Sequence, residues 1–186
     1  MATKAKSHLT VEQYLEQYEG AEGRYELVRG EVVKMASETA QHVRLKFFVA
    51  IALKNSISKA GLPCEVFTDG MTVKINKDTG REPDASVQCG KKVDPKSLLL
   101  DSPVIVVEVI SPSSEISDTQ DKLADYFSVP SIQHYIIVKP EERYVLHHKR
   151  LEDDEVLTAI VRSGQMVFDP PGIAISMKDI FGEVDQ

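Results

Sequence analysis

Two acidic residues near the middle of the chain have the surroundings expected of a metal site. Glu108 lies within an apolar run, Pro103-Val-Ile-Val-Val-Glu-Val-Ile110, and Asp84 directly follows Pro83. Burying a carboxylate without a partner carries a large desolvation penalty, so Glu108 should face a metal, a cation or a shared proton. Two acids on neighbouring strands would repel each other, and a divalent cation would remove that repulsion. The pattern favours a metal-dependent hydrolase site over a purely structural core.

Each acid also has a simpler interpretation. Glu108 could lie at a strand end and reach solvent or a nearby lysine. Asp84 alone could make the local backbone hydrogen bond that is common for Asp in turns. The apolar residues on both sides of Glu108 favour a central strand that is covered on both faces.

A lysine follows the Glu108 strand at a position from which it could reach the acids. Asp118, Lys122 and Tyr126 recur every fourth residue, so they share one face of a predicted helix. A surface Asp–Lys pair, worth a few tenths of a kcal/mol, is the simpler interpretation of the spacing. The functional interpretation is a lysine that stabilises charge on a phosphate and orients a water molecule.

Several other polar residues carry less information. His42 lies on the same helical stripe as Leu45 and Val49, where a histidine is commonly a core or boundary residue. Glu26 and Glu31, in an early hairpin, are expected to be exposed acids.

The ligands available in the sequence suggest which metal would bind. His147 and His148 alternate across a strand, so they cannot both face one metal. Without a Cys or His cluster, the ligand set consists of hard carboxylate oxygens, which select Mg²⁺ or Mn²⁺ over Zn²⁺.

The predicted elements indicate an α/β fold of mixed α+β character. A capping-box pattern at residues 10–13 predicts a helix over 11–18, and Arg29-Gly30 predicts a hairpin between strands 24–28 and 31–35. Further helices are expected at 38–59 and 118–127, and further strands at 64–68, 71–76, 84–88, 103–110, 132–138, 144–148, 156–162 and 165–168. The polar segments 90–102 and 111–114 are expected to be a loop and a turn. The strand–helix–strand order over 103–138 predicts a parallel crossover and hence a mixed sheet.

The composition is that of an ordinary globular protein. Of 186 residues, 42% are hydrophobic and 27% charged, which predicts one domain over 10–182 after a flexible segment 1–9. No apolar run approaches the roughly 20 residues that cross a bilayer. The first residues lack the apolar segment of a signal peptide, so a cytoplasmic protein without a membrane partner is expected.

The cysteines and the net charge refine these expectations. Cys64 and Cys89 have no CxxC spacing and are expected to be free thiols in a reducing cytoplasm. The net charge of −7 weighs against nucleic-acid binding, which draws on Lys and Arg. Acidic residues that bind a metal would account for part of this excess of negative charge.

Several motifs recur in an order that resembles a known family. They are residues 24–35, His42, Pro83-Asp84, Val106-Val-Glu-Val-Ile-Ser-Pro-Ser113, the Asp118, Lys122 and Tyr126 spacing, and Tyr135-Ile-Ile-Val138. Over residues 8–182 the chain resembles the Uma-two family of restriction-endonuclease-like proteins, within the PD-(D/E)xK nuclease superfamily. The resemblance implies a restriction-endonuclease-like core, in which helices flank a central mixed β-sheet.

Carried over residue by residue, the resemblance also implies a site. Asp84 and Glu108 correspond to the metal-binding acids, and the backbone carbonyl of Val109 would be a further ligand. The lysine of the superfamily would fall at Ile110, so its role would pass to Lys122 on the following helix. His42 would be an accessory residue of the site.

The implied function is that of a Mg²⁺- or Mn²⁺-dependent DNA endonuclease. A homodimer would supply the two active sites needed to cut both strands. Two alternatives stay open. One is a non-catalytic member that binds DNA or protein, which Ile110 and the acidic net charge favour. The other is hydrolysis of RNA or another phosphodiester.

Overall fold

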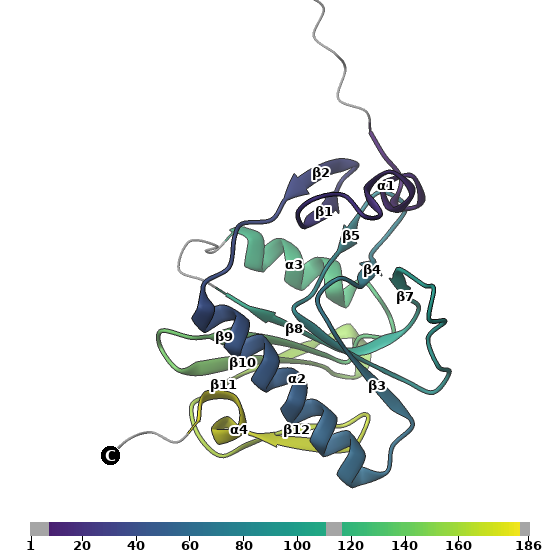
Figure 1. Ribbon diagram of the computed structural model, residues 1–186. Coiled ribbons are helices and arrows are strands. Elements are labelled where there is room, and N and C mark those ends of the chain that lie inside the picture. The colour runs from purple at the N-terminus through teal and green to yellow at the C-terminus, as the bar shows by residue number, and fades with distance from the viewer. Residues whose placement is uncertain (1–7, 111–116, 183–186) are drawn as a thin grey trace, which may run out of the picture.

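A six-stranded mixed sheet lies at the centre of the fold (Figure 1). The computed structural model describes residues 8–110 and 117–182. The strand order is β11 (Val156–Val161), β10 (Tyr144–Arg150), β9 (His134–Lys139), β8 (Pro103–Val109), β6 (Ala85–Cys89) and β3 (Cys64–Thr68). Strands β8 and β9 are parallel, and the other neighbours are antiparallel. The mixed α/β fold and its parallel crossover are therefore confirmed.

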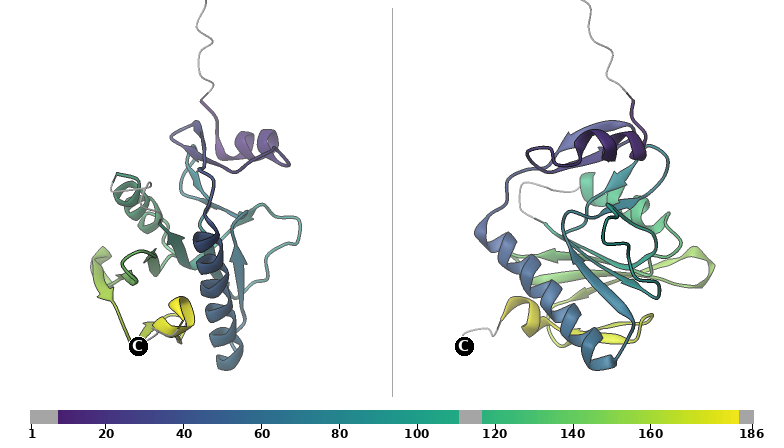
Figure 2. Two further views of the ribbon diagram at one scale, coloured as in Figure 1. Left: turned by 60° about the vertical axis from the view of Figure 1, so that its left-hand side comes forward. Right: turned by 45° about the vertical axis from the view of Figure 1, so that its right-hand side comes forward.

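Strand β8 is buried along its whole length because helices cover both faces of the sheet. Val107 and Val109 belong to the core beneath α2 (Ala40–Ala60), whereas Val106 belongs to the core beneath α3 (Ser117–Phe127). Figure 2 shows the two helices on opposite sides of the sheet. The sequence pattern on both sides of Glu108 thus correctly indicates a central strand.

Helix α2 connects the large sheet to the C-terminal elements. Its apolar stripe, which includes Leu45, Val49 and Leu53, packs into the same core as the two-stranded sheet of β12 (Gln165–Phe168) and β13 (Ile173–Ser176). The short helix α4 (Met177–Phe181) also contacts α2. None of the described helices has the length and apolar character required to span a membrane.

A second, five-stranded sheet lies beside α3 and carries the N-terminal part of the chain. Its order is β2 (Glu31–Lys34), β1 (Tyr25–Val28), β5 (Gly80–Arg81), β4 (Thr72–Lys74) and β7 (Leu99–Leu100). Arg29 and Gly30 both have positive φ, of 50° and 77°, which gives the predicted hairpin its tight turn. The predicted helix α1 (Val11–Tyr18) begins with the Thr10 capping box.

The sequence patterns missed the shortest elements. Strands β5 and β7 have two residues each, and the one-turn helix η1 (Glu152–Asp154) has three, so none is long enough to display a period. Strand β13 and helix α4 were also not predicted. The expected turn at 111–114 lies outside the described residues.

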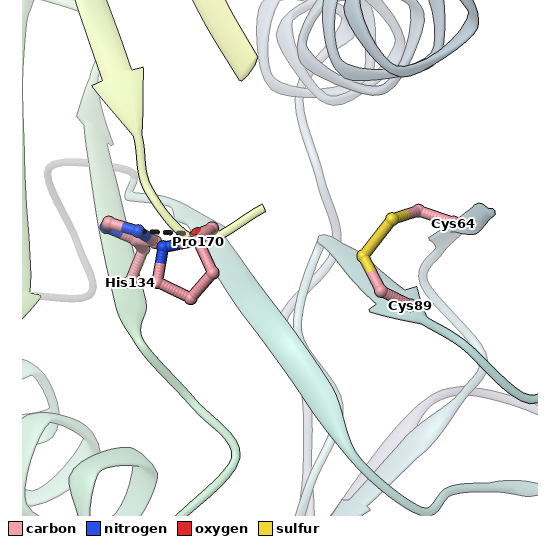
Figure 3. The surroundings of a disulfide bond; sticks show 4 residues. All are labelled: Cys64, Cys89, His134 and Pro170. Carbon is pink, nitrogen blue, oxygen red and sulfur yellow. Dashed lines mark hydrogen bonds between the residues drawn. A yellow bond between two sulfur atoms is a disulfide. The ribbon is translucent and has the colours of Figure 1, made fainter. Parts of the chain in front are cut away.

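The expectation of free thiols is wrong, because Cys64 and Cys89 form a disulfide (Figure 3). The two cysteines are direct partners on the antiparallel strands β3 and β6, and their Cα atoms are 3.9 Å apart. They are separated by 25 residues in sequence. Their pairing depends on the register of two strands and is not encoded in any local spacing.

A pair of buried histidines joins β9 and β10 to the loop after β12. Nδ1 of His134 lies 2.9 Å from Nε2 of His147, and its Nε2 lies 2.9 Å from the carbonyl oxygen of Pro170 (Figure 3). Because a carbonyl only accepts, Nε2 of His134 must carry the proton. In the neutral ring Nδ1 then accepts from His147. Burial and nearby positive charge lower the pKa of each histidine to about 4.

We expect reduction of the disulfide to lower the free energy of unfolding by about 3 kcal/mol, because the bond closes a long loop in the unfolded chain. Urea denaturation with and without reductant measures the difference. The Cys64→Ala, Cys89→Ala double variant should be insensitive to reductant. Thiols that titrate in the native, unreduced protein would contradict the disulfide.

Acidification from about pH 6.5 to about 4 should lower the free energy of unfolding. In this range the unfolded chain binds a proton at His134 and at His147, whereas the folded chain does not. Denaturation at several pH values measures the slope. His134→Gln keeps a donor for Pro170 but cannot titrate, so it should reduce the slope. An unchanged slope in this variant would argue against the His pair as its source.

Candidate functional site

Strand pairing brings the backbone of Asp84 next to Glu108. The N–H of Asp84 donates to the carbonyl of Val107 at 2.9 Å, and its carboxylate accepts the N–H of Val109 at 2.7 Å. Asp84 therefore contacts the residues immediately before and after Glu108 on β8. Both acids are buried, with 3% and 6% of their surfaces exposed. Of the simpler interpretations, a Glu108 that reaches solvent does not apply, whereas a Glu108 that reaches a nearby lysine is what the structure shows.

The carboxylate of Asp84 faces α2. Lys46 Nζ lies 3.1 Å from its Oδ1, and His42 Nε2 lies 3.3 Å from its Oδ2. Burial alone would raise the pKa of Asp84. His42, Lys46 and the Val109 N–H together outweigh burial and lower it below the usual value. Asp84 is therefore ionised at neutral pH, and the predicted accessory residue His42 is in contact with it.

The carboxylate of Glu108 is held by two donors from α3. Lys122 Nζ donates to Oε1 at 3.0 Å, and the Tyr126 hydroxyl donates to the same oxygen at 2.7 Å. Burial raises the pKa of Glu108 to about 7, against the effect of Lys122 and with a contribution from the charge of Asp84. Burial and the nearby acids also raise the pKa of Tyr126 well above its usual value, so its hydroxyl stays a donor.

The helical stripe after β8 therefore reaches the acids as the functional interpretation expects. Lys122 is only 6% exposed, which excludes the alternative of a surface ion pair for this residue. Tyr126 is fully buried and its ring packs against Tyr135, with centroids 5.0 Å apart. The side chain of Asp118, the first member of the stripe, lies outside the described part of the chain.

Glu26 is not the exposed acid that the hairpin pattern suggested. It is 6% exposed and accepts hydrogen bonds from Arg81 at 3.0 Å and from the backbone N–H of Glu82 at 3.1 Å, and it lies 3.3 Å from Lys122 Nζ. Arg81 also donates to Asp125 on α3 at 2.7 and 2.8 Å. A charged residue in an alternating strand usually faces solvent. Here Glu26 is buried instead, because cations from distant segments of the chain, Arg81 and Lys122, contact it.

A second buried lysine was missed by the sequence analysis. Lys46 Nζ contacts three carboxylates: Glu38 at 2.8 Å, Asp69 at 2.7 Å and Asp84 at 3.1 Å. Burial alone would lower its pKa, but these acids raise it above the usual value. Glu38, His42 and Lys46 recur every fourth residue, a spacing that could have identified this cluster beside the Leu45 and Val49 stripe.

Arg24, just before β1, is the second cation in the cluster around Asp84. One of its guanidinium nitrogens lies 2.9 Å from Glu82 and 3.9 Å from Asp84. The other forms a close ion pair with Glu38 and lies 3.4 Å from Asp69. Arg24 and Lys46 thus contact four acids, so negative charge exceeds positive charge on the α2 side of the site. Lys122 and Arg81 contact the acids on the α3 side.

The side chains of Glu38, His42 and Asp84 lie close enough together to hold a divalent cation. One ligand atom from each of Glu38, His42 and Asp84 lies within 4.8 Å of the others. His42 Nε2 is buried and lies 3.3 Å from Asp84 Oδ2 without the geometry of a hydrogen bond, so imidazole and carboxylate are placed to share a cation. Carboxylate oxygens and an imidazole nitrogen are common protein ligands of divalent cations.

Glu108 is not in this group, because its carboxylate is held by donors from α3. The backbone N–H of Val109 donates a hydrogen bond to the carboxylate of Asp84. The ligand role expected of the Val109 carbonyl stays a prediction.

Comparisons with known proteins identify a family model, two relatives and a similar solved structure. A family model named Uma2, described as "Putative restriction endonuclease", matches residues 11–178. Two uncharacterized proteins of Synechocystis sp. are similar: slr1290 is 25% identical over 93% of this chain and 91% of its own length, and sll1609 is 27% identical over 80% and 85%.

A crystal structure described as a putative nuclease belonging to DUF820, from Anabaena variabilis, superimposes with a TM-score of 0.71. The match covers 93% of this chain and 97% of that chain at 14% identity. The expected fold is thereby confirmed.

Replacing Glu26 by Ala should lower the free energy of unfolding by about 3 kcal/mol, because it leaves a buried arginine and a buried lysine short of a negative partner. Glu16→Ala, an exposed acid on α1, is the matched control and should change it by less than about 0.5 kcal/mol. Chemical denaturation measures both. Equal effects of the two variants would show that the Glu26 network contributes little.

Proposed function

This chain belongs to the Uma2 family, and from that membership we propose that it is a nuclease that hydrolyses phosphodiester bonds in DNA with Mg²⁺ or Mn²⁺ as cofactor. One observation carries the proposal: two buried carboxylates from neighbouring strands, Asp84 and Glu108, each contact a buried lysine. Structural cores seldom contain such a set, whereas hydrolytic sites commonly do. A homodimer would place two such sites on the two strands of DNA.

Asp84 is the ligand that any metal position in this site would share. The geometry around it supports Glu38 and His42 as its co-ligands. The family resemblance supports Glu108 and the carbonyl of Val109. A bound divalent cation supplies Lewis acidity toward a phosphate oxygen and lowers the pKa of water.

The residues of the chain would then act through charge and position. Asp84 remains ionised and provides a permanent negative charge. Lys122, held by Glu108 and Glu26, would offset negative charge that develops on the phosphate and orient a water molecule. Tyr126 donates to Glu108 and so fixes the carboxylate that holds this lysine. None of these roles requires a covalent intermediate.

The contacts of Lys46 favour a second candidate function. Its ammonium group already contacts Glu38, Asp69 and Asp84 and gives each acid a positive partner without a metal. A set of acids satisfied in this way would suit a non-catalytic module that keeps the nuclease fold to bind DNA or protein. Metal binding separates the two candidates, because a binding module has no need of a cation.

The decisive experiment is cleavage of plasmid and single-stranded DNA with Mg²⁺ or Mn²⁺, combined with calorimetry of metal binding. Asp84→Ala, Glu108→Ala and Lys122→Ala should each reduce cleavage by at least about 100-fold, because Asp84 would hold the metal, Glu108 holds Lys122, and Lys122 would offset charge on the phosphate. Asp84→Ala should also abolish metal binding, whereas Lys122→Ala should retain it.

Lys54→Met, an exposed lysine on α2, is the control and should cleave normally. Glu38→Gln distinguishes the two ligand sets, because only a metal held by Glu38 and His42 should lose affinity in this variant. Full activity in Lys122→Ala would remove the proposed role of that lysine. Absence of both cleavage and metal binding in the wild-type protein would favour the binding module.

A further inference from the structure

A pocket of about 440 Å³ adjoins the candidate active site. It lies between the end of α1, the start of β1 and the start of β4. Arg24, Asp69 and Glu82 line the pocket and also belong to the charge cluster around Asp84. A ligand in the pocket would therefore contact Arg24, which itself contacts Asp84 and Glu38, the acids of the candidate metal site. Its volume falls within the roughly 300–1,000 Å³ common for small-molecule sites.

Three tyrosines form one wall of this pocket. The rings of Tyr14 and Tyr18 are stacked with centroids 5.5 Å apart, and Tyr18 meets Tyr25 edge to face at 5.1 Å. The Tyr14 hydroxyl donates to the backbone carbonyl of Tyr25, and the Tyr25 hydroxyl donates to that of Glu22. These bonds fix two of the rings, while Tyr18 remains half-buried. The pocket is thus lined by a preformed aromatic cluster, in which the half-buried ring of Tyr18 is available for stacking.

The charged residues of the pocket determine whether it favours the base or the phosphate of a nucleotide. Three acids line it, Glu19, Asp69 and Glu82, against the single cation Arg24. That guanidinium is already paired with Asp69, Glu82 and Glu38. A phosphate would meet net negative charge there and be repelled. A planar group that donates hydrogen bonds would be accepted, because carboxylate oxygens only accept.

We propose that this pocket receives an unstacked nucleobase with an exocyclic amine, namely adenine, cytosine or guanine, from the nucleotide next to the phosphate in the active site. The inference rests on the proposed nuclease function and specifies its substrate. The base would stack on the tyrosine wall and direct its amine toward Glu82 or Asp69. Thymine has no such amine and would bind less well. Because an unpaired base is the easiest to unstack, single-stranded or mismatched DNA would be preferred.

Binding of short single-stranded oligonucleotides, followed by fluorescence anisotropy with Ca²⁺ in place of Mg²⁺, tests the pocket. The wild-type protein should bind oligo(dA) and oligo(dC) more tightly than oligo(dT). Tyr18→Leu should weaken oligo(dA) binding about tenfold, because it removes the stacking surface but retains apolar volume. Glu82→Gln should reduce the preference over oligo(dT).

Tyr144→Leu, a half-buried tyrosine on β10 outside the pocket, is the matched control and should bind like the wild-type protein. Cooperative urea unfolding establishes that each variant is folded. Equal binding by Tyr18→Leu and Tyr144→Leu, with metal-dependent cleavage intact in the wild-type protein, would overturn the pocket and leave the nuclease function standing. A wild-type protein that neither binds nor cleaves DNA would overturn both.

Discussion

Two buried lysines, one from each helix that covers the sheet, offset the cost of burying the acids at the centre of this protein. A carboxylate removed from water must find a positive partner or give up its charge. Lys46 on α2 supplies that partner for Asp84, and Lys122 on α3 supplies it for Glu108. Strand β8 lies between the two helices, so the packing of both helices on the sheet also sets the electrostatics of the site. Displacement of either helix would leave an unpaired charge inside the protein.

The positions that the sequence predicted well are those governed by local rules. The Thr10 capping box, the Arg29-Gly30 turn and the apolar periodicity of α2 each depend on a few consecutive residues, and each is found as expected. Glu108 was recognisable because a charged residue in an apolar strand conflicts with its surroundings. Helical spacing placed Lys122 and Tyr126 on one face but favoured a surface ion pair, and only the family resemblance pointed to a role for Lys122 in the site.

The positions that the sequence did not reveal depend on contacts between distant segments. Glu26 is neutralised by Arg81 and Lys122, which no pattern around the hairpin could indicate. Cys64 and Cys89 meet because of the register between β3 and β6. The division of the acids into one group facing α2 and another facing α3 likewise follows from how the helices pack on the sheet.

The distribution of tyrosines gives the protein a useful optical property. The chain has six tyrosines and no tryptophan, so its intrinsic fluorescence comes from tyrosine alone. Three of the rings form the wall of the pocket, and Tyr126 with Tyr135 lies beside Glu108. Five of the six tyrosine rings therefore lie in the pocket wall or in the group of side chains packed around Tyr126. Changes in the charge or occupancy of that region can be followed spectroscopically without attaching a label.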